Sequence, residues 1–108
     1  MNWFLKDANG RWLWPGYGDN SRVLKWICER VDGTAKAHQT PIGNLPTPDA
    51  LDLAGLNLSA ENVSQLLSVD VTGWQKETDD IAAYYPKFGD RLPGPLSQQL
   101  DELRKRLR

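Results

Sequence analysis

A mostly helical α+β fold is predicted for this chain, with an N-terminal β-hairpin and a loop followed by about five helices. Two short aromatic-rich runs flank a turn sequence within residues 2–14, a pattern typical of a hairpin. Further along, apolar side chains recur at helical spacing, and several of these segments begin with a residue suited to cap a helix. The 108 residues are 40% hydrophobic and 25% charged, which fits one small globular domain.

The hairpin is expected to turn at residues 7–10, because Gly10 can adopt a positive φ. Two registers are open. A two-residue loop would place Phe4 and Trp12 on opposite faces, whereas a three-residue loop would place Phe4, Trp12 and Trp14 on one face. The choice between them decides whether the aromatic side chains can act together.

A loop at residues 15–18 and a helix over residues 21–31 are expected next. Pro15-Gly16-Tyr17-Gly18 suits neither a strand nor the start of a helix, and Asp19 or Asn20 can cap the helix that follows. The apolar residues of this helix repeat every three or four positions: Val23, Leu24, Ile27, Cys28 and Val31. Asp32-Gly33 is expected to end it, and Cys28 is expected to be a buried packing residue.

The middle of the chain is expected to be extended at residues 34–46, where two prolines exclude a regular helix. Thr47-Pro48 is typical of the start of a short helix, which would end near Gly55. Ser59 and Asp70 are the expected caps of two more helices. The apolar side chains of these two helices are Val63, Leu66 and Leu67, and then Trp74, Ile81, Tyr84 and Tyr85.

The end of the chain is expected to form a loop from Pro86 to Pro95 and then an amphipathic helix. Four leucines stand at helical spacing in this helix: Leu96, Leu100, Leu103 and Leu107. Its last turn is rich in arginine and lysine, which the helix dipole favours at that end.

The charge and cysteine content exclude several classes of function. A net charge of −1, from 13 basic and 14 acidic residues, lacks the basic footprint of a nucleic-acid binder. No apolar run approaches the roughly 20 residues of a membrane span, so no membrane partner is expected. A lone cysteine cannot form an internal disulfide, which fits a cytoplasmic setting. His38 has no second histidine or cysteine nearby, so no metal site is expected there.

The aromatic and glycine-rich run near the N-terminus is the candidate binding site. Six of the ten aromatic residues lie within the first 26 positions, next to loop glycines and a helix N-terminus. Flat side chains can stack on a base, glycines allow close approach, and a helix N-terminus favours an anion. These features suit a nucleotide; the alternative is a tryptophan-rich small core beneath the hairpin. The Asn20 amide can read a purine edge, but Asn20 and Asp19 can equally serve only as helix caps.

The first residues carry a resemblance to a known family. With Asn2-Trp3-Phe4 and then Leu-Trp-Pro-Gly-Tyr-Gly-Asp-Asn-Ser-Arg-Val-Leu-Lys-Trp at residues 13–26, the sequence resembles the C-terminal end of GTP-dependent phosphoenolpyruvate carboxykinase. The likeness continues through Arg30-Val31-Asp32-Gly33, Thr40-Pro41-Ile42-Gly43 and Asp49-Ala50-Leu51. It covers essentially the whole chain, and the first 22 residues are its specific part.

The resemblance implies part of a lyase that converts oxaloacetate and GTP to phosphoenolpyruvate, GDP and CO2 in gluconeogenesis, with Mn²⁺ or Mg²⁺. It implies a C-terminal fragment of a monomeric cytoplasmic enzyme, with the hairpin and guanine-binding loop at residues 1–22 and a helical remainder at 23–108. The family's metal ligands, phosphate loop and oxaloacetate-binding arginines lie upstream of this segment. We therefore expect no catalytic residue and no metal ligand here, and no activity from the fragment without its N-terminal part.

The same resemblance places a guanine base against six residues of this chain. Three aromatics would enclose the base, Asn20 would hydrogen-bond its edge, and two residues would shape the loop. In chain order the six are Phe4, Trp12, Tyr17, Gly18, Asp19 and Asn20. Because Phe4 and Trp12 must share one face to do this, the three-residue turn is the register we predict. The alternative function is a stand-alone helical module that binds a partner protein through its aromatic face and has no catalytic role.

Overall fold

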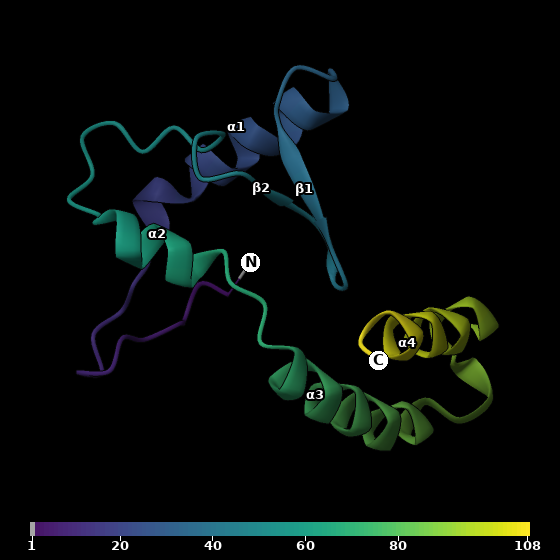
Figure 1. Cartoon of the computed structure of the whole chain (residues 1–108). Helices are drawn as coiled ribbons and strands as arrows, with labels where there is room; N and C mark the ends of the chain where they lie inside the picture. The colour runs from purple at the N-terminus through teal and green to yellow at the C-terminus, as the bar shows by residue number, and fades with distance from the viewer. Residues whose placement is uncertain (1) are drawn as a thin grey trace. The chain divides into compact units, whose positions relative to one another are not determined.

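The computed structural model describes residues 2–108 and divides them into two compact units (Figure 1). Unit 1 comprises residues 2–39 and 44–68, and unit 2 comprises residues 40–43 and 69–108. The elements in chain order are η1 (Tyr17–Asp19), α1 (Asn20–Val31), β1 (Ala37–Thr40), β2 (Gly43–Pro46), α2 (Ala60–Leu66), α3 (Val71–Tyr84), η2 (Tyr85–Arg91) and α4 (Gly94–Arg106). The α+β class is confirmed, but these residues form four α-helices and two 3-10 segments in place of about five helices.

The N-terminal hairpin has the predicted three-residue turn. The Asp7 N–H donates to the Arg11 carbonyl at 2.8 Å, and Lys6 and Trp12 form an antiparallel bridge. Gly10 has a φ of 78°, the left-handed conformation that this turn requires. Strand pairing within residues 2–14 is limited to this one bridge, so the segment is a hairpin turn without two regular strands.

The Asp7 side chain stabilises that turn. Its Oδ1 accepts the backbone N–H groups of Asn9 at 2.8 Å and Arg11 at 2.9 Å. The hydrogen bond from the Arg11 backbone is the main reason that the pKa of Asp7 is lowered, because it favours the ionised carboxylate. The aspartate therefore sets the local geometry that follows it.

The regular two-stranded sheet lies further along the chain, where extended backbone was expected. Strands β1 and β2 pair directly, and the turn between them is closed by the Thr40 hydroxyl, which donates to the Gly43 carbonyl at 2.6 Å. Pro46, the last residue of β2, is buried. The prolines exclude a helix here, as predicted. The segment is not only extended, because its two strands also pair with each other to form a small sheet.

Helix α1 begins at Asn20, and neither expected side-chain cap forms. The N-cap residue is Asp19, but its backbone is helical, with φ −94° and ψ −1°. A capping side chain reaches the first N–H groups of a helix from an extended backbone. Because the Asp19 backbone is helical, its carboxylate does not reach the first N–H groups of α1. The preceding turn η1 supplies backbone acceptors instead, and Asn20 N–H donates to the Tyr17 carbonyl. Gly33, with a φ of 77°, follows the helix end, as predicted.

Four of the five residues in the apolar stripe of α1 are exposed, which corrects the prediction for Cys28. Cys28 is an exposed free thiol, and Leu24 and Val31 beside it are 61% and 83% exposed. Val23 and Trp26 instead turn toward the apolar side chains of unit 1. Helical spacing groups these residues on faces of the helix, but the described chain covers only one of those faces.

The short helix expected from Thr47-Pro48 to Gly55 does not form. Two separate turns take its place, with Ala50 N–H donating to the Thr47 carbonyl and Leu56 N–H donating to the Leu53 carbonyl. The Thr47 hydroxyl donates to the Asp49 carboxylate at 2.6 Å. Because this side chain bonds to another side chain, it does not cap a helix.

The caps of the next two helices are confirmed. The Ser59 hydroxyl accepts the Asn62 N–H at 3.1 Å at the start of α2. The Asp70 carboxylate accepts the Gly73 N–H at 3.0 Å at the start of α3. Both residues have extended backbone, the conformation from which a side chain can reach the first turn.

In unit 2, helices α3 and α4 form a pair joined by η2 (Figure 1). The loop expected from Pro86 to Pro95 is largely this 3-10 segment, and α4 already begins at Gly94. Leu100, Leu107 and Thr78 are buried, and Gln75 Nε2 donates to the Leu107 carbonyl at 2.7 Å. Leu96, in the first turn of α4, is 45% exposed, so the leucine stripe is buried toward its C-terminal end.

The buried hydrophobic side chains of unit 1 are Leu13, Trp14 and Val63. They come from the hairpin and α2, so the N-terminal turn is part of the core of its unit. No helix in the described part of the chain is long and apolar enough to cross a membrane.

Candidate functional site

Phe4 and Trp12 form an exposed aromatic pair on one face of the hairpin. Their ring centroids lie 5.9 Å apart with an edge-to-face angle of 71°. Phe4 is 74% exposed and Trp12 is 56% exposed. The Lys6 ammonium lies 4.2 Å from the centroid of the Trp12 ring, a cation–π distance. This face therefore offers flat aromatic surface beside a positive charge.

Trp14 does not share that face, which corrects one part of the predicted arrangement. It is 3% exposed, and its ring lies 5.9 Å from that of Trp3. The chain bends at residues 13–14, directly after the bridge at Trp12, so strand alternation no longer decides where Trp14 lies. The tryptophan-rich core and the exposed aromatic face thus both exist, at different residues.

Tyr17 and Gly18 lie in η1, at the approach to α1. Tyr17 is 91% exposed, the largest exposure among the exposed large hydrophobic side chains of residues 2–108. Gly18 has an ordinary φ, and a Cβ at this position would meet no atom of the described chain within 4 Å. Both residues therefore face open space, and the intramolecular packing around them does not require either residue type.

Asn20 and Asp19 make specific side-chain contacts instead of helix caps. The Asn20 Oδ1 accepts the indole N–H of Trp14 at 2.9 Å. The Asp19 Oδ1 accepts Arg22 Nε at 3.0 Å, and Arg22 Nη1 donates to the Asp52 carbonyl at 2.8 Å. These bonds tie the loop to the core on one side and to the segment around residue 52 on the other.

Asp52 also pairs with Lys25, whose ammonium lies 3.0 Å from its Oδ2. That hydrogen bond, together with the one from the Ala54 N–H, lowers the pKa of Asp52. The same contact raises the pKa of Lys25, because each charge favours the ionised form of the other. The charges flanking the loop are therefore paired within unit 1.

The predicted site residues fall into two groups in unit 1. Phe4 and Trp12 form one group, and residues 17–20 form the other. Trp14 connects them, since it contacts Trp3 beside Phe4 and also binds Asn20.

Sequence reasoning missed three contributors. The Asp19–Arg22 pair was detectable from its i, i+3 spacing at the helix start. The contact of Lys6 with Trp12 follows from the hairpin register. The link through Trp14 had no local signal, because it depends on the bend of the chain.

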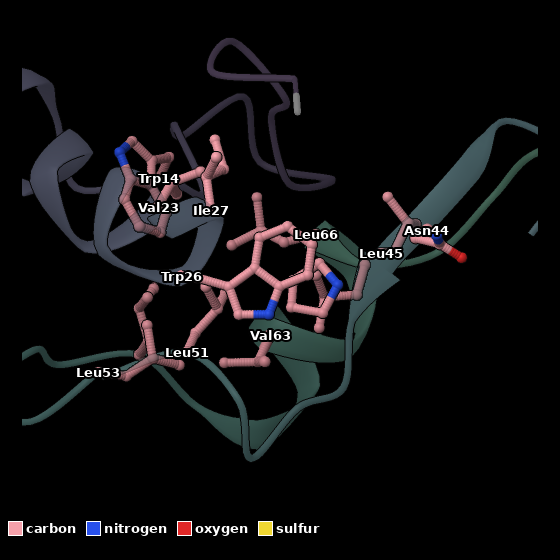
Figure 2. A pocket seen from close by; sticks show the side chains of 13 residues that line it. Trp14, Val23, Trp26, Ile27, Asn44, Leu45, Leu51, Leu53, Val63 and Leu66 are labelled. Atoms are coloured by element: carbon pink, nitrogen blue, oxygen red, sulfur yellow. The ribbon is translucent and has the colours of Figure 1, made fainter. Parts of the chain in front are cut away.

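A separate apolar cavity of about 170 Å³ lies inside unit 1 (Figure 2). Figure 2 shows the indole of Trp26 among aliphatic side chains from α1, α2 and the segments between them. Asn44 is the one amide in the lining, and no charged side chain contributes to it. Phe4, Trp12 and Tyr17 are not among its lining residues, so this cavity is separate from the predicted aromatic site.

The described residues do not fit a divalent metal centre. Across residues 2–108, no group of three or more histidine, cysteine, aspartate or glutamate side chains is placed to hold a metal ion. The carboxylates of Asp19 and Asp52 pair with Arg22 and Lys25.

The chain is similar to known proteins over nearly its whole length. The family model for the phosphoenolpyruvate carboxykinase C-terminal P-loop domain matches residues 1–106 of this sequence. The phosphoenolpyruvate carboxykinase [GTP] of Treponema pallidum (strain Nichols) is 55% identical over 108 residues, which is 99% of this chain and 18% of the relative. The enzyme of the same name from Neocallimastix frontalis is 51% identical over 109 residues, and that from Chlamydia abortus is 47% identical.

The chain spans 18% of the length of these relatives. The family model covers residues 1–106 of this chain, which include the hairpin, the loop and the four α-helices of the described residues. A stand-alone protein-binding module is not favoured by these matches. The chain belongs to the GTP-dependent phosphoenolpyruvate carboxykinase family and corresponds to its C-terminal domain.

Proposed function

We propose that this chain supplies part of the guanine-binding pocket of an enzyme that converts oxaloacetate and GTP to phosphoenolpyruvate, GDP and CO2. The observation that carries the proposal is the exposure of Phe4, Trp12 and Tyr17 within one short segment. Burying apolar surface is worth about 25 cal/mol per Å², so leaving three large rings in water is unfavourable unless a ligand or partner covers them. A planar base is a ligand that aromatic faces can cover from both sides.

Each residue of the proposed pocket has a distinct role. Phe4 and Trp12 provide one aromatic surface, and Tyr17 provides a second. Gly18 allows the ligand to approach the backbone, because no Cβ stands in its way. Asn20 hydrogen-bonds the edge of the base. Asp19 shapes the loop through its bond to Arg22, and the family resemblance together with the exposed rings supports this assignment.

The chemical step belongs to the rest of the enzyme in this proposal. A divalent ion, Mn²⁺ or Mg²⁺, supplies charge stabilisation for phosphoryl transfer in such enzymes, and the residues described here offer no cluster to hold it. The chain by itself is therefore expected to form no phosphoenolpyruvate from oxaloacetate, GTP and Mn²⁺. The proposed setting is a monomeric cytoplasmic enzyme of gluconeogenesis.

The test uses the full-length enzyme that carries this chain, with the substitutions Asn20→Ala and Trp12→Ala. We expect Asn20→Ala to lower kcat/KM for GTP and to narrow the preference for GTP over ATP. We expect Trp12→Ala to weaken all purine nucleotides alike, because a ring offers only a face that every base can share. Circular dichroism checks that both variants remain folded. An Asn20→Ala enzyme with an unchanged preference would rule out the base-reading role.

A further inference from the structure

Trp14 carries a hydrogen-bond donor that is buried and has one partner. The side chain is 3% exposed, and its Nε1–H donates to Asn20 Oδ1 at 2.9 Å. An indole can only donate, and in a side-chain amide only the oxygen can accept. The bond therefore requires the amide oxygen of Asn20 to face Trp14 and the NH₂ group to face away from it.

Trp14 is itself held by its surroundings, so it acts as a fixed reference for the amide. Its ring packs 5.9 Å from the ring of Trp3. It also borders the apolar cavity of unit 1, where Figure 2 shows it beside Val23 on α1. Asn20 is the first residue of the same helix. The donor residue Trp14 therefore packs against α1, and the acceptor residue Asn20 belongs to that same helix.

The NH₂ group of Asn20 remains available to a ligand. Its nitrogen donates no hydrogen bond to any described residue. Guanine presents a carbonyl acceptor at its six position, where adenine presents an amino donor. The Asn20 NH₂ group can donate to the guanine carbonyl. Against adenine it would face the amino group, and two opposed donors are unfavourable once water is excluded.

We infer that Trp14 is a positioning residue that sets the base preference of the site by turning the NH₂ group of Asn20 toward the six position of the purine. This inference rests on the proposed function, because it assumes that the base lies at Asn20. Trp14 need not touch the nucleotide, since it acts through Asn20.

The test is Trp14→Phe in the full-length enzyme, with steady-state kinetics for GTP, ITP and ATP. Phenylalanine keeps an aromatic ring in the core but has no N–H. We expect the ratio of kcat/KM for GTP over ATP to fall roughly tenfold, the usual effect of a lost buried hydrogen bond. GTP and ITP should fall together, because both bases carry the six-position carbonyl. The change should lie mainly in KM.

Trp3→Phe is the matched control, because it makes the same change in the neighbouring ring. It should leave the GTP/ATP ratio unaltered. A second control is a double-mutant cycle: in an Asn20→Ala enzyme, Trp14→Phe should not change the ratio further. If Trp14→Phe fails to fold, Trp14→Met replaces it. Methionine fills an apolar site and offers no donor, so the same fall in the ratio is expected.

The outcomes separate this inference from the proposal beneath it. An unchanged GTP/ATP ratio in folded Trp14→Phe, or in folded Trp14→Met, overturns the role of Trp14 and leaves the guanine site standing. An equal loss for all three nucleotides in Trp14→Phe and Trp3→Phe assigns Trp14 to packing alone. A wild-type enzyme that does not prefer GTP to ATP overturns both the role of Trp14 and the proposed guanine site.

Discussion

Arg22 joins Asp19 to the carbonyl of Asp52, with Nε 3.0 Å from the Asp19 carboxylate and Nη1 2.8 Å from the carbonyl oxygen. The guanidinium thus connects Asp19, directly before α1, with the backbone of Asp52, which lies 30 residues after Arg22. Two donors in a fixed geometry make both bonds at once, which a lysine cannot reproduce.

Replacing this arginine should loosen the loop. We expect Arg22→Lys to lower the free energy of unfolding by roughly 1 kcal/mol, because one of the two bonds is lost, and to weaken GTP binding by the full-length enzyme. Urea unfolding and nucleotide titration measure the two effects. Arg30→Lys, on the same helix and away from the loop, is the comparison. Equal nucleotide affinity in both variants would contradict a role for the Arg22 bridge.

The hairpin turn should tolerate little change at Gly10. Its φ is 78°, and a Cβ there would meet nothing within 4 Å, so the cost of Gly10→Ala comes from the backbone alone. We expect a loss of about 1–2 kcal/mol in the free energy of unfolding, measured in urea. Gly10→Asn should lose less, because asparagine adopts the left-handed conformation more readily. An alanine variant as stable as the wild type would be inconsistent with this turn.

Gly18 offers the opposite case. Its backbone conformation is ordinary, and a Cβ would again meet nothing within 4 Å. Gly18→Ala should therefore leave stability unchanged or slightly improved, while GTP affinity of the full-length enzyme falls because the new methyl group meets the ligand. Differential scanning fluorimetry and nucleotide titration provide the two readouts. Retained affinity would mean that the ligand does not approach this backbone.

Acid should weaken the contact between Asp52 and Lys25. The pKa of Asp52 is lowered below its ordinary value of 3.8, mainly by the bond from Lys25. The stabilisation is therefore fully present above that value and is lost as the pH falls through the lower folded-state pKa. We expect Asp52→Asn to be less stable than the wild type at neutral pH, and the difference to shrink in acid. Urea midpoints between about pH 2 and pH 7 test this, and a constant difference would refute it.

Cys28 should react readily in the isolated chain. It is exposed, together with Leu24 and Val31 on the same helix. A neutral aromatic disulfide reagent should label one thiol per chain without denaturant, and Cys28→Ser should abolish the signal. We expect slower labelling in the full-length enzyme, where further chain can cover this face. Labelling of the isolated chain that requires urea would show that the thiol is covered.

The features predictable from the sequence are those decided by neighbouring residues. Ser59 and Asp70 were recognisable as caps because each binds an N–H three residues away. For these two caps the interaction lies within a few residues, so local chemistry is sufficient. The position of the turn at Gly10 was also local, but its register was left open by the sequence and was chosen because the family resemblance needs Phe4 and Trp12 on one face.

The features that were not predictable depend on what lies beyond the local segment. Helical spacing placed Cys28 on an apolar stripe, but spacing does not say which side chains of a stripe another element covers. Thr47 resembled a cap, but its hydroxyl binds the Asp49 carboxylate instead. Trp14 was expected beside Trp12, and a bend in the chain takes it into the core. The same bend produces its bond to Asn20, which no spacing rule anticipates.

The uncovered apolar side chains should be visible in calorimetry. Within residues 2–108, ten large hydrophobic side chains are at least 40% exposed, whereas five hydrophobic side chains are buried. The heat capacity change of unfolding follows the apolar surface that unfolding newly exposes. For this chain alone it should be small for its length, which gives a flat stability curve and a broad thermal transition. Association with the remainder of a carboxykinase should instead show a large negative heat capacity change, as the same side chains leave water.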